Sequence, residues 1–280
     1  MKKQTFYKYQ GAGNDFLIAD NRDGSLQLSE KQISSLCDRR YGVGADGLML
    51  LEKSSQYDFK MVYYNSDGSG GMMCGNGGRC IVAFASDMGL DHFDFDAADG
   101  FHTAQILSDV DGTKVVRIKM KDVASIEQYS SLTGTGVSSD GVFLDTGTRH
   151  YVRFVKDLET YDIVSEGRDI RYNAQELQPV GANVNYVELY DGGIKVRTYE
   201  KGVEDETFAC GTGIVASSIA SYKNGLKPSE CLSDGRVKYN VIAKRDSLSV
   251  DFVPAEKMLA EDVWLTGPAV FVARIIIDKI

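Results

Sequence analysis

Apolar residues along the chain fall mainly into short runs that are bounded by turn residues. Many of these runs are rich in β-branched and aromatic residues, which is typical of β-strands. The pattern predicts extended segments at residues 16–20, 48–52, 61–64, 103–108, 115–120, 142–145, 151–155, 184–190 and 195–199. Glycine-containing turns at 111–112 and 191–193 separate several of them. Most of the chain is therefore predicted to form strands and hairpins.

One helix is marked by its first residues. Ser29 and Gln32 form a capping box, and the apolar positions of 33–37 then lie on one face of a helix expected to run to about Arg40. The following residues, 42–47, spell G-x-G-x-x-G, the dinucleotide fingerprint. That fingerprint requires a strand before it and a helix after it, and here the order is reversed. The segment is therefore predicted to be a turn from helix to strand and not a nucleotide site.

Two parts of the chain repeat one pattern about half a chain length apart. In each, a strand and a loop lead to C-G-x-G, at Cys74 and at Cys210, followed by an apolar stretch and then Gly-Leu. The two stretches, 76–88 and 212–224, are apolar on nearly every face, as a buried helix would be. The glycine of Gly-Leu stands where such a helix would end. The repeat thus predicts a cysteine at the N-terminus of a buried helix in each half.

Composition then limits the class of protein. An apolar fraction of 43% is enough for a packed core, and 31 Lys and Arg against 40 Asp and Glu give a net charge of −9. Nucleic acid and anionic membranes both favour a basic surface, so neither is expected as a partner. No apolar run approaches the ~18 residues that span a bilayer, and the first residues lack the apolar region of a signal peptide. We therefore expect a cytoplasmic protein.

The five cysteines are not expected to form a cross-linked framework or a metal site. Their number is odd, and no secretion signal accompanies them. There is no C-x-x-C, and the three histidines are scattered, so zinc is not expected. Cys37, Cys80 and Cys231 are predicted to pack in the core as small apolar residues.

Cys74 and Cys210 differ from the others because each is predicted at a helix N-terminus. The backbone N–H groups and partial positive charge there favour a thiolate and can bind a carboxylate. Two such halves facing each other would place one sulfur on either side of an amino-acid carbon. One thiolate could then remove a proton while the other thiol delivers one to the opposite face. Pyridoxal phosphate could stabilise the carbanion instead of N–H groups, but two paired cysteines make it unnecessary.

At these residues the chain resembles the diaminopimelate epimerases, pyridoxal-independent two-cysteine enzymes of lysine and peptidoglycan-precursor biosynthesis. The resemblance covers essentially the whole length. It is carried by GAGNDF (11–16), RRYGVGADGL (39–48), NSDGSGGMMCGNGGRC (65–80), GANVNY (181–186) and YEKGVEDETFACGTG (199–213). The related proline racemases and PhzF-type isomerases match these segments less well.

The resemblance implies an α+β fold of two pseudo-symmetric lobes, each a mostly antiparallel or mixed β-sheet wrapped around a central helix. With the repeat, it predicts one lobe of residues 1–121 and 265–280 that carries Cys74, and a second of residues 122–264 that carries Cys210. It implies a small-molecule amino-acid substrate, diaminopimelate, with no cofactor and no metal. It also allows a homodimer.

Carried over residue by residue, the resemblance makes Cys74 and Cys210 the two acid/base thiols. The substrate contacts that it implies are Asn14, Asn65, Gly75, Asn76, Asn183, Glu200, Lys201, Gly211 and Thr212. Amides, one acid and one cation suit a zwitterion with two carboxylates and two ammonium groups. Asn14 and Asn65 could instead form turns, and Asn183 could bond to backbone at the start of a strand. The two charged residues could be solvated at a strand end.

The chain departs from the family pattern at two places. Lys201 stands where the family commonly has arginine, so a bidentate grip on a carboxylate is lost. A G-N-P-H or G-S-P-H type segment here reads G-T-R-H, with Thr148 in place of an amide and Arg149 in place of a rigid proline. Arg149 could compensate for Lys201 or could face solvent. Both changes concern the distal end of the substrate and not the proton transfers.

Three other functions stay open from the sequence. The chain could be a racemase or isomerase of another amino acid on the same fold, a thiol redox protein using Cys74 and Cys80, or a noncatalytic small-molecule binding module. A C-x5-C spacing would direct the redox pair to different faces of a helix, and a binding module needs no symmetric thiols. The leading prediction is an epimerase that interconverts LL- and meso-diaminopimelate.

Overall fold

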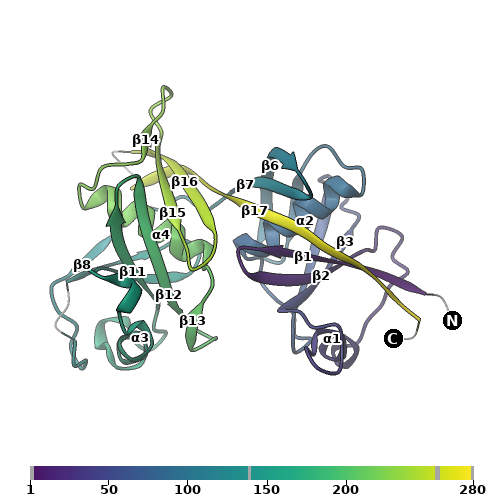
Figure 1. The fold of residues 1–280 in the computed structure, drawn as a ribbon, viewed down its shortest axis with the longest axis horizontal. Helices are drawn as coiled ribbons and strands as arrows, with labels where there is room; N and C mark the ends of the chain where they lie inside the picture. Colours follow the sequence, from purple (N-terminus) through teal and green to yellow (C-terminus); the bar gives the residue numbers. More distant parts are fainter. Residues whose placement is uncertain (1–2, 138–139, 256–258, 279–280) are drawn as a thin grey trace. The chain divides into compact units, whose positions relative to one another are not determined.

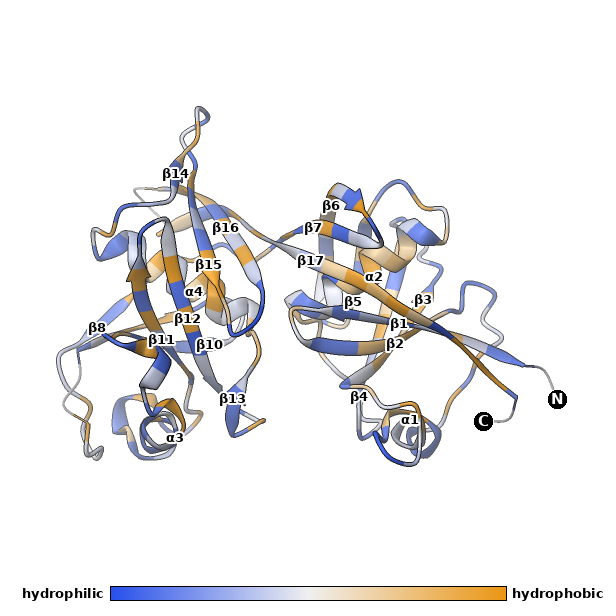
Figure 2. Cartoon of the chain, in the orientation of Figure 1, coloured by the Kyte–Doolittle hydropathy of each residue, from blue (hydrophilic) through white to orange (hydrophobic). Residues whose placement is uncertain are grey.

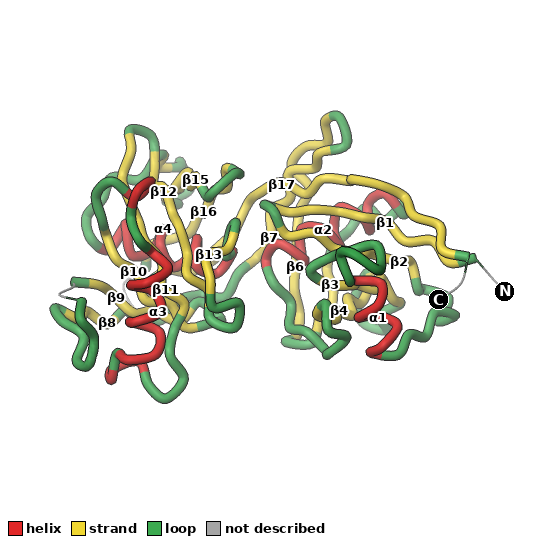
Figure 3. The backbone as a smooth tube through the Cα atoms, turned by 60° about the horizontal axis from the view of Figure 1, so that its bottom comes forward, coloured by secondary structure: helices red, strands yellow, loops and turns green. Residues whose placement is uncertain are grey.

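The structure, a computed structural model, describes residues 3–137, 140–255 and 259–278. The chain divides into two compact units. The first comprises the residues up to Lys119 together with those from Thr266 onward, and the second is Met120–Leu265. Figure 1 follows the chain through both units, and Figure 3 shows that strands outweigh helices in each. None of the described helices has the length and apolar character needed to cross a membrane.

The strands of the first unit pair into a closed ring. Starting from the C-terminal part of β17 (Ala260–Ile277), the order is β1, β2, β3, β4, β5, β6, β7 and back to β17. The pairs β2–β3 and β4–β5 are parallel, and the others are antiparallel. The bounds are β1 Gln4–Gly11, β2 Asn14–Asp20, β3 Gly47–Glu52, β4 Phe59–Asn65, β5 Asp94–Ala97, β6 Gly100–Val110 and β7 Thr113–Lys119.

Helix α2 (Gly75–Asp87) is the core of this ring. It contacts β1, β2, β3, β6 and β7, and every residue from Gly75 to Ala85 is buried. Figure 2 shows its hydrophobic residues. Helix and sheet approach closely at Gly78, where an added Cβ would lie 2.5 Å from the side chain of Ile118. The helix ends where predicted, with Gly89 in the left-handed region at φ +89°.

Helix α1 (Glu30–Cys37) begins with the predicted capping box, in which Ser29 and Gln32 bond reciprocally. The prediction that it runs to about Arg40 was wrong. Asp38 is extended, and its carboxylate accepts the N–H groups of Arg40 and Tyr41, each at 2.7 Å, so the chain turns instead of adding a helical turn. Residues 42–47 then lead from this helix into β3, as predicted.

A mixed sheet wraps helix α4 (Gly211–Lys223) in the second unit. Its described pairings run β8–β9–β10–β11–β12–β15–β16, with β13 beside β12 and β14 beside β15. The bounds are β8 Glu127–Tyr129, β9 Gly141–Asp145, β10 Arg149–Phe154, β11 Asn183–Tyr190, β12 Gly193–Glu200, β13 Asp205–Thr207, β14 Glu230–Cys231, β15 Val237–Ile242 and β16 Ser247–Pro254. The strands β9, β10, β11, β12, β15 and β16 contact α4.

A second helix of this unit, α3 (Ile163–Asn173), packs on β11, β12 and β13. Ile163 and Ile170 belong to an apolar cluster that also contains Tyr199. Contact is closest at Gly167, where an added Cβ would lie 2.5 Å from the Tyr199 side chain. Each unit is therefore α+β, with a sheet around a buried central helix, as predicted.

Candidate active site

Cys74 is the N-cap of α2, as the repeat predicted. Its backbone is extended (φ −118°, ψ 151°), and its Sγ accepts the N–H of Gly77 at 3.3 Å. The side chain is exposed, although the helix that follows is buried. The sulfur thus lies at the positive end of the helix dipole, where negative charge is favoured and where an anion can bind.

Two of the predicted substrate residues meet beside Cys74. Asn76, in the first turn of α2, is 3% exposed, and its Nδ2 donates to Oδ1 of Asn14 at 2.5 Å. Asn14 begins β2, and its own Nδ2 donates to Asp46 at 3.0 Å. The structure therefore brings Asn14, Gly75 and Asn76 together at one helix end.

Asn65 is placed differently. It is the last residue of β4, and its Nδ2 donates to Ser69 Oγ at 3.1 Å, while its backbone N–H donates to the carbonyl of Ser69 at 2.9 Å. Among the described residues, the hydrogen bonds of its side-chain amide stay within this turn, and none of them reaches Asn14 or Asn76. Its predicted contact with the substrate stays a prediction.

Cys210 is the N-cap of α4, so the second half of the repeat is also confirmed. Its backbone is extended (φ −104°, ψ 109°), and the residue is 9% exposed. Its Sγ lies 3.5 Å from Oγ1 of Thr212. The carbonyl of Thr212 accepts a hydrogen bond from Thr146 Oγ1 at 3.0 Å, which fixes the first turn of the helix against the end of β9.

From Thr212, hydrogen bonds continue into the core of the second unit. Thr148 Oγ1 lies 3.0 Å from Thr212 Oγ1 and 2.9 Å from Nε2 of His150. On its other side, His150 Nδ1 lies 3.0 Å from Nδ2 of Asn185. Burial lowers the pKa of His150 to about 3, so the imidazole is neutral at physiological pH. The hydroxyl of Thr148 thus links a neutral histidine to the residue beside Cys210.

Asn183, Glu200 and Lys201 lie together where β11 begins and β12 ends. Asn183 Nδ2 donates to the carbonyl of Arg149 at 3.2 Å, and its Oδ1 accepts the N–H of Lys201 at 2.9 Å. This is the backbone-bonding role that the sequence left open for Asn183. Burial raises the pKa of Glu200, which favours its protonated form relative to an exposed glutamate. Lys201 is exposed.

Arg149 does not share a face of β10 with His150, because neighbouring side chains of a strand alternate. Its guanidinium lies over the ring of Phe143, 4.9 Å from the centroid. Phe143 packs on the apolar cluster beneath α3. Of the two alternatives for Arg149, this stacking favours a role away from the distal carboxylate of a substrate.

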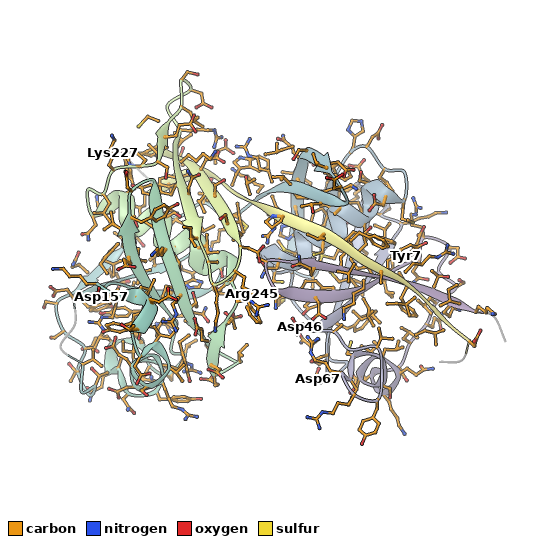
Figure 4. All side chains as sticks on the ribbon, viewed as in Figure 1. Tyr7, Asp46, Asp67, Asp157, Lys227 and Arg245 are labelled. Carbon is orange, nitrogen blue, oxygen red and sulfur yellow. The ribbon has the colours of Figure 1, made fainter. Side chains whose placement is uncertain are left out.

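The segment that leads into Cys210 is held by the turn between β15 and β16. Phe208 is 41% exposed, and Lys244 and Arg245 both lie over its ring, 5.7 Å and 5.2 Å from the centroid. The carbonyl of Phe208 accepts the N–H of Lys244 at 3.3 Å. Figure 4 labels Arg245 on this turn. No sequence pattern had marked these two cations.

The remaining cysteines behave in two ways. Cys37 and Cys80 are buried, as predicted, and burial raises the pKa of Cys37 to about 11 and that of Cys80 further. The prediction for Cys231 was wrong, because it lies exposed on the short strand β14. A buried thiol with a raised pKa is a poor nucleophile, so Cys80 does not suit a redox pair with Cys74.

Sequence analysis had given no role to Asp46, Arg79 or Asn185. Asp46 and Arg79 stand inside two segments that carried the family resemblance. Nothing local shows the partner of Asp46, whereas the spacing of Arg79 from Asn76, three residues along the predicted helix, was an available signal. Asn185 stands inside the strand predicted at 184–190, where an amide among apolar neighbours was the available signal. Among the described residues, no cluster of three His, Cys, Asp or Glu could hold a metal ion.

The fold is one that solved structures share. The chain superposes on a phenazine biosynthesis protein of the PhzF family from Bacillus anthracis with a TM-score of 0.74 at 16% identity, covering 100% of both chains. A hydroxyproline epimerase from Agrobacterium vitis matches with a TM-score of 0.66 at 15% identity, covering 99% of this chain and 91% of that one. The chain thus has the fold of these two proteins, with a cysteine as the N-cap of the central helix in each of its units.

Sequence relatives give the family within that class. Diaminopimelate epimerase from Flavobacterium psychrophilum is 42% identical over 273 residues, which is 95% of this chain and 97% of that protein. The diaminopimelate epimerase of Chlorobaculum tepidum is 39% identical over 269 residues, 94% of this chain and 97% of that protein. The model of the diaminopimelate epimerase family matches residues 6–124. The chain belongs to the diaminopimelate epimerase family, which confirms the resemblance inferred from its motifs.

Proposed function

We propose that this protein is an isomerase that interconverts LL-2,6-diaminopimelate and meso-2,6-diaminopimelate. The observation that carries the proposal is that each unit of this epimerase-family chain has a cysteine as the N-cap of its buried central helix. One such cysteine could be incidental to folding. Two opposed acid/base groups can invert a carbon bearing hydrogen, one on each face, and the two units supply one each.

In the proposed reaction, the thiolate of one cysteine takes the α-proton, forming an S–H bond as the C–H bond breaks. The electron pair left on carbon delocalises into the adjacent carboxylate. The thiol of the other cysteine then gives its proton to the opposite face, and its sulfur keeps the electron pair as a thiolate. Backbone N–H groups at a helix N-terminus stabilise the charge on the carboxylate, so no pyridoxal cofactor is needed.

The direct test is an assay of the purified protein with LL-diaminopimelate and no added cofactor, with the isomers separated by chiral chromatography. We expect meso product to form until the two isomers are in equilibrium. Proline and glutamate are offered in parallel as competing substrates. Faster turnover of either, or a pyridoxal absorption band in active protein, would contradict the proposal.

Lys201 is proposed to contact the distal carboxylate of the substrate. We expect Lys201→Ala to raise KM for diaminopimelate by about tenfold with little change in kcat, because a charge-assisted hydrogen bond is lost away from the reacting carbon. Arg149→Ala is the matched control and should change KM by less than about twofold, since its guanidinium stacks on Phe143. Steady-state kinetics of both variants measure this. Equal, large increases in KM would show that Arg149 shares the carboxylate contact.

The remaining substrate contacts inferred from the family belong to the same proposal: Asn14, Asn65, Gly75, Asn76, Asn183, Glu200, Gly211 and Thr212. Cytoplasmic location and a homodimer also stay predictions. Gel filtration with light scattering would measure the number of subunits.

A further inference from the structure

A line of hydrogen bonds joins a buried cation to a partly exposed carboxylate through Asn76 and Asn14. At the buried end, Arg79 is 0% exposed and its Nη2 donates to Asn76 Oδ1 at 2.8 Å. Asn76 Nδ2 donates to Asn14 Oδ1 at 2.5 Å, and Asn14 Nδ2 donates to Asp46 Oδ2 at 3.0 Å. These four side chains are called the amide relay below.

The two ends of the amide relay fix its direction. The carboxylate of Asp46 can only accept hydrogen bonds, and the guanidinium of Arg79 can only donate them. An asparagine amide has nearly the same shape when its oxygen and nitrogen exchange places, so packing alone does not choose between the two orientations. Between a fixed acceptor and a fixed donor, only one orientation of each amide forms all three bonds.

Asp46 is itself held in place. Its Oδ1 accepts from Arg39 at 2.6 Å, and its Oδ2 also accepts the backbone N–H of Asp15 at 3.2 Å. Burial alone would raise the pKa of Asp15, but hydrogen bonds from Arg39 and Lys8 outweigh it and lower the pKa to about 2. Figure 4 labels Asp46, whose side chain is 37% exposed. The acceptor end of the amide relay is therefore a carboxylate fixed by a cation and by the start of β2.

We propose that Asp46 is a positioning residue for substrate binding, because it holds Asn14, and through it Asn76, in a single amide orientation. The inference rests on the proposed function, which places both asparagines at the substrate. A substrate carboxylate needs N–H donors. An asparagine amide whose oxygen and nitrogen had exchanged places would offer the carboxylate an oxygen instead. Asp46 thus acts on the substrate through Asn14 without touching it.

The test is Asp46→Asn, which keeps the size of the side chain but can offer either an oxygen or an N–H to Asn14. We expect KM for diaminopimelate to rise by about tenfold and kcat to change by less than about twofold, because a charge-assisted bond becomes one that allows both orientations. Asp20→Asn, at the other end of β2, makes the same chemical change at an ion pair with Arg22 and should leave KM unchanged. Arg39→Gln removes a cation from Asp46 but keeps the Asp46–Asn14 bond, and should raise KM by less than about threefold. Equal increases in KM for Asp46→Asn and Arg39→Gln would overturn the proposal in favour of a general role of the ion cluster.

A second measurement separates this inference from the proposed function. In protein labelled with ¹⁵N at asparagine, the side-chain NH₂ signals of Asn14 and Asn76 should move in Asp46→Asn without any substrate, while those of Asn65 should not. Unchanged Asn14 and Asn76 signals would overturn the amide relay even in an active enzyme. Absence of epimerase activity in the unmodified protein, with the NH₂ signals moving as expected, would overturn only the proposed function.

Discussion

Cys74→Ala and Cys210→Ala are each expected to lower kcat for epimerisation by about a thousandfold or more. The two-thiol reaction needs one group on each face of the α-carbon, so neither thiol can replace the other, and a positioned acid or base contributes on the order of 10²–10⁴ in rate. Both residues are N-caps whose helices are held by packing of nearly every face, so the fold should survive. Rates of meso formation and thermal melting followed by circular dichroism measure the two effects.

Cys231→Ala provides a matched control, because Cys231 is exposed on β14 and lies outside the proposed site. Its activity should equal that of the unmodified protein. A loss of only a fewfold in either Cys74→Ala or Cys210→Ala would refute the assignment of two acid/base thiols. Loss of activity together with a collapsed melting transition would instead show that the cysteine is needed for folding.

Epimerisation in D₂O is expected to label the product completely and the substrate not at all at early times. Thiol hydrogens exchange rapidly with solvent, so the thiol that protonates the carbanion carries deuterium. Starting from the LL isomer, each first-formed meso molecule should contain deuterium at the inverted α-carbon. On the other face, the thiolate becomes a thiol that holds the proton it removed. While the substrate is bound, this thiol can return only that original proton, so the LL pool should stay unlabelled at first. Mass spectrometry of the separated isomers measures both pools.

A reaction with one base would give a different distribution of label. A single group serving both faces would return some original proton to the product and would label substrate and product together. Deuterium that enters the LL pool as early as the meso pool would therefore contradict separate roles for Cys74 and Cys210. The same experiment with Lys201→Ala is a control, because a change in binding alone should leave the distribution of label unchanged.

Local signals in the sequence were sufficient for the elements that carry the thiols. The capping box of Ser29, the C-G-x-G loops and the glycines after both central helices correspond to caps and helix ends in the structure. Other elements lacked such signals. Helix α3 contains Gly167, which disfavours a helix in isolation, yet its close packing on Tyr199 leaves no room for a larger residue. β17 contains Gly267 and Pro268, and this pair of residues locally predicts the end of a strand and not its interior.

The candidate site was predictable in its residues and not in its contacts. Sequence and resemblance named Asn14 and Asn76, but the bonds of Asn14 to Asp46 and to Asn76 depend on where the closed ring places the start of β2. Thr148 was noted as a departure from the family, whereas its position between Thr212 and His150 follows only from the pairing of β9 with β10 beside α4. The contacts of Asn14 with Asp46 and Asn76, and of Thr148 with Thr212, join residues far apart in sequence, so no local pattern encodes them.

Strand β17 has a consequence for the order in which the protein can be completed. It leaves the second unit after Leu265, and its residues 267–277 then pair with β7 on one side and β1 on the other, which closes the ring of the first unit. Synthesis proceeds from the N-terminus, and domains generally fold in that order. Here the ribosome makes all of Met120–Leu265 before it makes the strand that closes the ring begun at Gln4. The first unit to emerge is therefore the last to be completed. Until β17 is made, the edges of β1 and β7 with which it pairs have no β17 strand beside them.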